Sequence, residues 1–178
     1  MTRIIAGEWR GHSLPRLTEG SVRPTTDRAR TVLFDTLREV HDRSVLDLYS
    51  GTGALGLESL SRGASSLVSI DRDRTYIEEQ RVWLKKHNTI FTSYVGDVGK
   101  VLSKLNQKFD LIFADPPYAE GISNDVLRLI EEHALPNAVF VYERAKRSDS
   151  EIESSIFTLA KEKVVAETRL QIYKANIQ

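Results

Sequence analysis

Residues 115 to 118 read Asp115-Pro116-Pro117-Tyr118 and directly follow the apolar run 109–114. Proline cannot donate a hydrogen bond to a sheet ladder, so a strand must end here, and each proline holds the residue before it in an extended conformation. The result is a stiff corner at the carboxyl end of a strand, where open α/β sheets bind ligands. Its carboxylate and carbonyls can accept hydrogen bonds from an amino group, and its ring can stack on a planar base. The corner therefore predicts a site for an exocyclic amine, with a rigid turn without chemistry as the alternative.

A glycine-rich turn forms a second candidate site, and it reads Asp47-Leu48-Tyr49-Ser50-Gly51-Thr52-Gly53-Ala54-Leu55-Gly56. Its glycines match G-x-G-x-x-G, and Asp71 follows about 20 residues later, where an acid can bind ribose hydroxyls. The pattern alone fits both NAD and S-adenosylmethionine. Inside the strand, Asp47 would repel a pyrophosphate and attract a cationic methionine moiety, and hydride transfer needs no amine-binding corner. The sequence therefore favours S-adenosylmethionine.

Asp97 and Val98 follow a third expected strand. Asp97 is placed to accept a hydrogen bond from the adenine amino group while Val98 packs on the ring, although an aspartate here is also typical of a helix N-cap. The predicted cofactor site therefore consists of Asp47, Tyr49, Gly51, Thr52, Gly53, Asp71, Arg72, Asp97, Val98 and Asp115.

The composition excludes several kinds of chemistry. The 178 residues are 40% hydrophobic and 28% charged and include no cysteine, which excludes disulfides, thiolate zinc sites and cysteine nucleophiles. No segment approaches the roughly 18 apolar residues of a membrane span, and no apolar signal segment is evident. We therefore expect a cytoplasmic protein without membrane contact. The four histidines are scattered along the chain, so we expect no metal site.

The charges balance overall but not locally. With 25 Lys plus Arg against 25 Asp plus Glu, the chain is not built to coat nucleic acid by phosphate neutralisation. Residues 1–30, however, carry six arginines against three acids, and the planar guanidinium suits phosphate. A second basic cluster lies at 144–147. The first segment is therefore a lid over the cofactor, a platform for RNA, or both.

Alternating strand and helix patterns must position these residues. Strands are expected at 44–49, 66–70, 90–95, 109–114 and 138–142, with helices at 54–62, 74–87, 98–105 and 125–133. This alternation predicts right-handed crossovers and a mostly parallel sheet. The strands at 157–165 and 168–174 are so close in sequence that they must form a hairpin, which makes the last strand antiparallel to its neighbour.

Residues 1–43 depart from this alternation. Residues 3–6 and 12–15 flank a glycine-containing turn and predict a small hairpin, and Thr25 or Thr26 is placed to cap a helix that continues to Leu37. We therefore divide the chain into an amino-terminal extension, 1–43, and a catalytic domain, 44–178.

Taken in order, residues 47–59, Asp71, Asp97 and 115–118 resemble the motif series of amino methyltransferases. The runs Arg23-Pro24-Thr25-Thr26-Asp27-Arg28 and Arg3-Ile4-Ile5-Ala6-Gly7-Glu8-Trp9-Arg10-Gly11 narrow the resemblance. They are similar to the bacterial 16S ribosomal RNA guanine-N2 methyltransferases that act on one guanine in the head of the small subunit. The resemblance covers nearly the whole chain. Two places depart from it: Tyr49-Ser50 stands where phenylalanine or cysteine followed by alanine is common, and residues 142–145 are a loose match.

The resemblance implies a Rossmann-like class I methyltransferase fold, α/β, with a mostly parallel seven-stranded sheet and an antiparallel strand near one edge. It implies methyl transfer from S-adenosylmethionine to the exocyclic N2 of a guanine, with S-adenosylhomocysteine as product. The corner, Asp115 to Tyr118, would be catalytic: Asp115 and the Pro116 carbonyl accept the N–H bonds, and Tyr118 stacks on a base that lies in a loop or is flipped out. RNA contacts would fall to Arg3, Arg10, Arg23, Thr25 and Arg28.

Two other functions remain open. The corner is shared with adenine-N6 methyltransferases of RNA or DNA, which the lack of a recognisable target-recognition domain disfavours. A cofactor-binding module without catalysis is disfavoured by the intact corner. We expect the partner to be 16S rRNA within an assembled or assembling 30S subunit, because a neutral chain of this size has little means of selecting one guanine from bare RNA. A monomer is expected.

Overall fold

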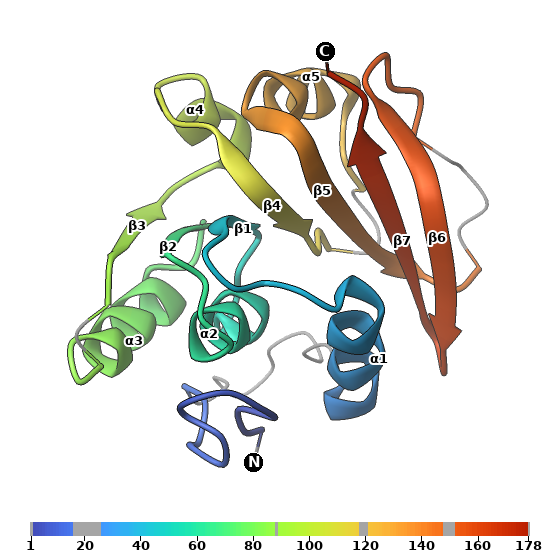
Figure 1. Cartoon of the computed structure of the whole chain (residues 1–178). Coiled ribbons are helices and arrows are strands. Elements are labelled where there is room, and N and C mark those ends of the chain that lie inside the picture. The colour runs from blue at the N-terminus through green and yellow to red at the C-terminus, as the bar shows by residue number, and fades with distance from the viewer. Residues whose placement is uncertain (1, 16–25, 88, 118–120, 148–151, 178) are drawn as a thin grey trace.

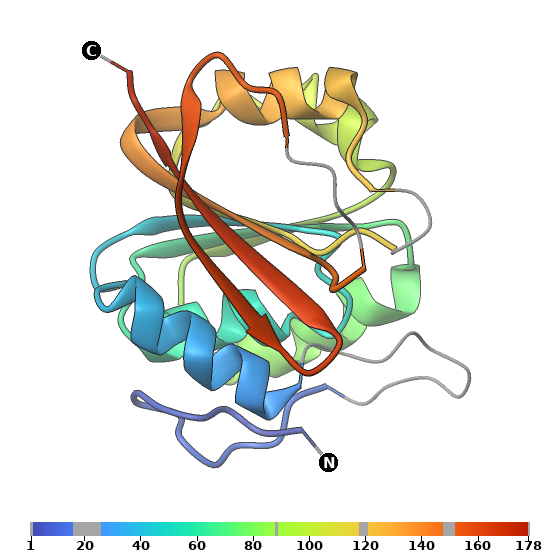
Figure 2. The same ribbon diagram turned by 90° about the vertical axis from the view of Figure 1, so that its right-hand side faces the viewer.

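The computed structural model describes residues 2–15, 26–87, 89–117, 121–147 and 152–177. The elements in chain order are α1 (Asp27–Leu37), β1 (Ser44–Leu48), α2 (Ala54–Ser61), β2 (Ser66–Asp71), α3 (Arg74–Leu84), β3 (Phe91–Val95), α4 (Val98–Leu102), β4 (Phe109–Ala114), α5 (Asn124–Glu132), β5 (Ala134–Ala145), β6 (Phe157–Val165) and β7 (Thr168–Ala175). Helices α1, α2 and α3 cover one face of a single sheet, and α4 and α5 cover the other (Figures 1 and 2). Among the described residues, no helix is long and apolar enough to cross a membrane.

The sheet has the mixed topology expected from the sequence. Its seven strands lie in the order β3-β2-β1-β4-β5-β7-β6. Strands β1 to β5 are parallel to one another, whereas β7 is antiparallel to both β5 and β6. The chain moves outward in one direction through β2 and β3 and then returns to the other side of β1 with β4. This reversal places the topological switch point between β1 and β4, and ligands bind at the carboxyl ends of such strands in sheets of this kind.

The central strands are apolar because both of their faces are buried. In β1, Val45 packs with the helices α1 to α3, while Leu46 and Leu48 pack with α4 and α5. Alternate residues of a strand point to opposite faces, so a strand covered on both sides has no place for regularly alternating polar residues. Asp47 is therefore an exception that requires a reason, because it is only 2% exposed.

Several boundaries differ from the sequence-based expectation. Helix α1 is capped by Thr26, whose hydroxyl oxygen accepts a hydrogen bond from the Ala29 N–H. Helices α3 and α4 end earlier than expected, at Leu84 and Leu102. Strand β5 is longer than 138–142, because Ala134 already pairs with β4 before the register shifts. An apolar run alone does not reveal such an irregularity.

The amino-terminal segment 2–15 has only part of the expected hairpin, a single antiparallel bridge between Arg3 and Ser13. Beside this bridge, the Ile4 N–H donates to the His12 carbonyl at 2.9 Å and the Leu14 N–H to the Thr2 carbonyl at 3.0 Å. The N–H groups of Ile5 and Ala6 instead bind a carboxylate of α2, so the pairing does not extend toward the turn. This segment covers α2, every residue of which is buried although its sequence is not uniformly apolar. The amino-terminal extension thus belongs to the same hydrophobic core as the sheet.

Candidate functional site

The two motifs found in the sequence meet at the carboxyl edge of the sheet. Leu48 at the end of β1 lies in register with Ala114 at the end of β4. The next residue, Asp115, donates its backbone N–H to the Leu48 carbonyl at 3.5 Å. The glycine-rich turn and the corner therefore begin side by side at the same level of neighbouring strands, as their positions in sequence predicted.

Asp47 is a buried acid without a cationic partner among the described residues. Its Oδ2 accepts a hydrogen bond from the Gly56 N–H at 3.0 Å. Burial, opposed by that hydrogen bond and reinforced by the negative charge of Asp71, raises the pKa of Asp47 to about 8. A positively charged group placed beside it would reverse most of this cost. The structure therefore fits a cationic ligand group, such as the ammonium of a methionine moiety.

Glycine is required at the three positions of the turn for different physical reasons. A side chain at Gly51, where φ is +51°, would meet nothing within 4 Å, so this backbone faces open space. A Cβ at Gly53 would lie 2.9 Å from Gln80 Cδ, and one at Gly56 would lie 2.7 Å from Leu67 Cδ1. Only the first of these glycines leaves room for a ligand, while the other two allow close packing of α2. A role for Gly53 in cofactor binding stays a prediction.

Asp71 and Gln80 hold the turn in its shape. The two carboxylate oxygens of Asp71 accept hydrogen bonds from the N–H groups of Gly51 and Asp73, both at 2.8 Å. The Gln80 side-chain amide donates to the Gly51 carbonyl at 2.7 Å and to the Ser50 hydroxyl at 3.0 Å. Since each carboxylate oxygen accepts more than one hydrogen bond, Asp71 keeps acceptor capacity for a ribose.

The turn also contains one residue in an unusual conformation. Tyr49 has φ +57°, in the left-handed region that non-glycine residues rarely adopt. Such a conformation costs on the order of 1–3 kcal/mol and is common near functional sites. Thr52 of the predicted site is buried, and Arg72 is exposed at the end of β2.

Asp97 caps α4, with its Oδ1 accepting a hydrogen bond from the Lys100 N–H at 3.0 Å. Its neighbour Val98 is buried in the core below α4 and α5. Gly96 donates its N–H to the Asp71 carbonyl at 2.8 Å, so the ends of β2 and β3 meet at the site. The capping interpretation of Asp97 is thus confirmed, and its contact with adenine stays a prediction that the exposed carboxylate permits.

The corner itself is tightly held. Pro116 is buried, and Asp115 and Pro117 are half-buried at the edge of the sheet. The Pro117 carbonyl accepts a hydrogen bond from the Gly121 N–H at 3.3 Å, which closes a short loop. Tyr118, the predicted stacking residue, lies outside the described residues.

Three of the predicted RNA-binding residues lie within the described part of the chain. Arg3, Arg10 and Arg28 are exposed, whereas Arg23 and Thr25 lie outside the described residues. Next to Arg10, the Trp9 N–H donates to the hydroxyl of Ser61, the last residue of α2. An eight-residue helix spans about 12 Å, so this part of the segment is one helix length from the glycine turn.

Sequence reasoning missed a buried cluster that fixes this segment. Glu58 in α2 accepts hydrogen bonds from the N–H groups of Ile5 at 2.8 Å and Ala6 at 3.0 Å, and from Arg62 Nε at 2.8 Å. Arg30, which is fully buried, lies 3.8 Å from the same carboxylate and donates to the Arg3 carbonyl at 2.8 Å. The signal was a single acid within an otherwise apolar helix.

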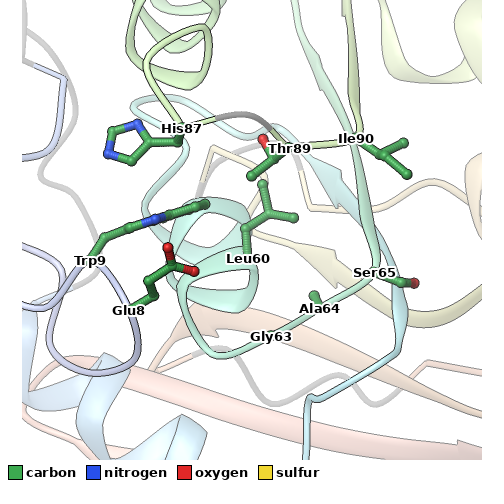
Figure 3. A pocket seen from close by; sticks show the side chains of 9 residues that line it. All are labelled: Glu8, Trp9, Leu60, Gly63, Ala64, Ser65, His87, Thr89 and Ile90. Carbon is green, nitrogen blue, oxygen red and sulfur yellow. The ribbon is translucent and has the colours of Figure 1, made fainter.

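A cavity of about 400 Å³ lies away from these motifs. It is lined by Glu8, Trp9, Leu60, Gly63, Ala64, Ser65, His87, Thr89 and Ile90. Figure 3 shows Glu8 and Trp9 reaching it from the amino-terminal segment and Leu60 from α2. Residues 63–65 and 89–90 precede β2 and β3, so the cavity lies at the opposite edge of the sheet from Asp115. It holds none of the predicted site residues and is not the candidate active site.

The histidines are surface or packing residues, and His12 and His41 are exposed. His133 is buried and its two ring nitrogens lie 2.7 Å and 3.0 Å from the carbonyls of Leu129 and Leu105. His87 stacks on Trp83 with ring centroids 4.0 Å apart. Within the described ranges, no three His, Asp or Glu side chains converge as a metal site requires.

Comparison with known proteins places this geometry in a family. The family model described as Conserved hypothetical protein 95 matches residues 2–174. Ribosomal RNA small subunit methyltransferase D of Escherichia coli K12 is 32% identical over 187 residues, which cover 99% of this chain and 91% of the relative. The protein of the same name from Haemophilus influenzae is 31% identical over 180 residues, with 97% and 93% covered.

Solved structures agree with the sequence matches. A putative methyltransferase, yhhF, from Escherichia coli superposes with a TM-score of 0.85 at 29% identity and 99% coverage of both chains. A putative methylase from Haemophilus influenzae has a TM-score of 0.81 at 30% identity, with 98% of both chains covered. The whole of this chain, including its amino-terminal extension, therefore has counterparts in single relatives of similar length.

Proposed function

Because the chain belongs to the Conserved hypothetical protein 95 family, we propose that it methylates the exocyclic N2 of a guanine in 16S ribosomal RNA, with S-adenosylmethionine as methyl donor. The observation that carries the proposal is the pairing of two sites on neighbouring strands: an uncompensated buried acid, Asp47, in β1 and an amine-accepting corner, Asp115 to Pro117, after β4. The relatives named as ribosomal RNA small subunit methyltransferases support RNA as the substrate.

The cofactor fits the groups at the ends of β1, β2 and β3. Asp47 would hold the methionine ammonium, the open backbone at Gly51 would lie along the ligand, and Asp71 would accept from the ribose. Asp97 would accept from the adenine amino group. The bound S-adenosylmethionine supplies a methyl group on a positively charged sulfur, which is already activated for transfer. The protein therefore contributes mainly position.

The corner acts on the nucleophile. The lone pair of a guanine N2 is delocalised into the base, which makes the nitrogen weakly nucleophilic. Hydrogen bonds from its two N–H groups to the Asp115 carboxylate and the Pro116 carbonyl favour a geometry in which the lone pair points away from the ring plane. Holding reactants in such a geometry accounts for a large share of enzymatic rate acceleration. Tyr118 would stack on the base.

The partner in this proposal is 16S rRNA within an assembled or assembling 30S subunit, bound by a monomer in the cytoplasm. Arg3, Arg10 and Arg28 are exposed as contacts to phosphate require, and Arg23 and Thr25 complete the set. Because Arg10 lies near the far end of α2, these contacts would follow the RNA backbone away from the target base.

A second candidate, methylation of adenine N6, rests on the same corner, whose acceptors would serve that amino group equally. The test is methyl transfer from labelled S-adenosylmethionine to 30S subunits from a strain lacking this protein, followed by nucleoside analysis of the RNA. We expect N2-methylguanosine at one site. N6-methyladenosine would replace the proposal by the second candidate.

The same assay tests the role of the corner. Asp115→Ala is expected to lower the transfer rate at least 100-fold, because the positioned acceptor is lost. Asp125→Ala, which removes an exposed acid of α5, is the matched control and should leave the rate unchanged. If wild-type protein binds S-adenosylhomocysteine in calorimetry but transfers no methyl group to RNA, the chain is a binding module and the proposed activity is wrong.

A further inference from the structure

Tyr142 occupies a place that the established motifs do not explain. It begins the segment 142–145, which matches the family pattern only loosely. In the sheet it lies in register with Ala114, the residue before the corner, on the neighbouring strand β5. The side chain is 5% exposed. Tyr142 is thus one strand away from Asp115 and at the same level.

The hydroxyl of Tyr142 meets the loop that returns from the corner. The Ile122 N–H donates a hydrogen bond to this hydroxyl oxygen at 3.2 Å. The preceding residue, Gly121, has φ +62°, and a Cβ there would lie 3.3 Å from the same oxygen. Gly121 also donates its own N–H to the Pro117 carbonyl at 3.3 Å. Two successive amides therefore connect the corner to the tip of Tyr142.

The ring of Tyr142 is held by contacts with two other residues of β5, Arg144 and Phe140. The Arg144 guanidinium lies 5.1 Å from the Tyr142 ring centroid. The Phe140 ring stacks with the Tyr142 ring, with centroids 6.2 Å apart and planes 13° apart. Arg144 donates from Nη1 to Gln171 Oε1 at 3.5 Å, which ties it to β7. The hydroxyl is therefore presented by the sheet rather than by a loop.

We propose that Tyr142 is a positioning residue for methyl transfer: its hydroxyl fixes the return of the corner loop at Ile122, so that the Pro116 and Pro117 peptides keep the orientation needed to accept the substrate amine. This inference rests on the proposed function. The mechanism requires that the Pro116 carbonyl stay aimed at the amine, and a loop tied only by the bond from Gly121 to Pro117 has more freedom. Catalysis by position is sensitive to displacements of about 1 Å.

The test compares two tyrosines that each lose one buried hydroxyl. Tyr142→Phe removes the acceptor for Ile122. Tyr173→Phe is the matched control, because Tyr173 is 2% exposed, lies on β7 opposite Phe140, and donates to Gln171 Oε1 at 3.1 Å. Both changes remove a buried hydrogen bond and should lower the Tm by a similar few degrees. Among the described residues, only Tyr142 of these two tyrosines has a hydroxyl that contacts the corner loop.

Two measurements separate positioning from general stability. The first is kcat and KM for 30S subunits: Tyr142→Phe should lower kcat about tenfold and change KM and the Kd for S-adenosylhomocysteine by less than twofold, while Tyr173→Phe leaves kcat unchanged. The second is amide hydrogen exchange without substrate, in which Gly121 and Ile122 should exchange at least tenfold faster in Tyr142→Phe than in Tyr173→Phe.

The outcomes distinguish this inference from the proposed function. Equal kcat in Tyr142→Phe and wild type, or an equal fall in both variants, would overturn the positioning role. If wild-type protein transfers no methyl group, the proposed function fails first, and exchange at Ile122 still reports whether the hydroxyl holds the loop. Unchanged exchange at Ile122 would overturn the inference whatever the activity.

Discussion

Two buried carboxylates on neighbouring elements, Asp47 in β1 and Glu58 in α2, have opposite surroundings. Glu58 is fully buried and accepts from two backbone amides and Arg62, with Arg30 at 3.8 Å. Asp47 is 2% exposed and accepts a hydrogen bond from the Gly56 amide, while the Asp71 charge that acts on it is negative. The charge of Glu58 is therefore compensated by cations and amides of the chain itself, whereas Asp47 has no cationic partner among the described residues.

The difference separates a structural acid, Glu58, from the acid that we propose to bind the cofactor, Asp47. A buried charge is tolerated when it is paired and hydrogen-bonded, and leaving it uncompensated costs free energy. Around Glu58 the compensation comes from residues 2–15, so the acid fastens the amino-terminal segment to α2. Around Asp47 the compensation is absent from the described residues, and the pKa is raised to about 8. A buried acid with a raised pKa near the carboxyl end of a central strand is a candidate binding group.

The largest expected effect concerns the structural acid. Glu58→Gln should lower the free energy of unfolding by about 3–5 kcal/mol, because its amide nitrogen cannot accept the hydrogen bonds from Ile5, Ala6 or Arg62, and Arg30 keeps only Asp27 as a charge partner. Denaturant unfolding measures the loss, and limited proteolysis should show residues 2–15 cleaved first. Glu132→Gln, an exposed acid in α5, is the control and should stay within about 0.5 kcal/mol. An unchanged stability of Glu58→Gln would break the comparison.

The corresponding change at the other acid should affect binding instead. Asp47→Asn is expected to weaken S-adenosylhomocysteine binding by about 10- to 100-fold, since a hydrogen bond to a charged group contributes about 1.5–3 kcal/mol. Calorimetric titration gives the Kd. Without ligand at pH 8, the variant should be no less stable than wild type. A strongly destabilised Asp47→Asn with unaltered affinity would assign Asp47 to the structural class of Glu58.

The pH dependence sharpens the contrast further. The pKa of Asp47 is raised from 3.8 to about 8 in the folded protein, so the native state holds a proton that the unfolded state has lost. Stability of the free protein should therefore fall as pH rises from about 4 to about 8, by at most about 1.4 kcal/mol per pH unit.

Binding should change in the opposite direction over part of this range. A cationic ligand requires ionised Asp47, so affinity for S-adenosylhomocysteine should increase by up to tenfold per pH unit between about 6 and 7.5. Titrations in buffers of different ionisation enthalpy should detect the released proton. Asp47→Asn removes both trends, and a wild type whose stability and affinity are flat over this range would contradict the raised pKa.

The smallest expected effect is that of replacing Arg28 in α1, and Arg30 of the same helix provides the contrast. Arg28 is exposed and Arg30 is buried beside Glu58. Arg28→Ala should raise KM for 30S subunits a few-fold and reduce the salt dependence of binding by about one phosphate contact, with stability and cofactor Kd unchanged. Arg30→Ala should instead destabilise the fold. If Arg28→Ala weakens cofactor binding as much as RNA methylation, the lid interpretation of this segment replaces the RNA one.

Sequence reasoning predicted the elements that depend on local pattern. The alternation of apolar strands with helices placed β1 to β5 correctly, and the short gap before residue 168 predicted the antiparallel β7. The corner and the glycine turn were expected to meet because both follow strands that a crossover makes parallel. These features need only periodicity and chain connectivity.

The features that the sequence did not predict depend on contacts between residues that are distant in the chain. That Gly53 packs on Gln80, or that Glu58 binds residues 2–15, follows from how helices lie in space and leaves no mark at a fixed spacing. The hairpin expected for residues 3–6 and 12–15 is short for the same reason, since the Ile5 and Ala6 amides donate to the distant Glu58 and not across the hairpin. Tyr118 lies outside the described residues, and its stacking role stays a prediction.

The fastening of the amino terminus has a consequence for how the chain is made. The Ile5 N–H donates to Glu58, which is 53 residues later in the chain, and the Ser13 carbonyl accepts from the Trp83 indole N–H, 70 residues later. At synthesis rates of about 5–20 residues per second, Trp83 is made about 4–14 seconds after Ser13. During vectorial synthesis residues 2–15 therefore cannot dock until α2 and α3 have been made, and Ile4, Trp9 and Leu14, all buried in the finished fold, stay exposed to solvent or chaperones until then.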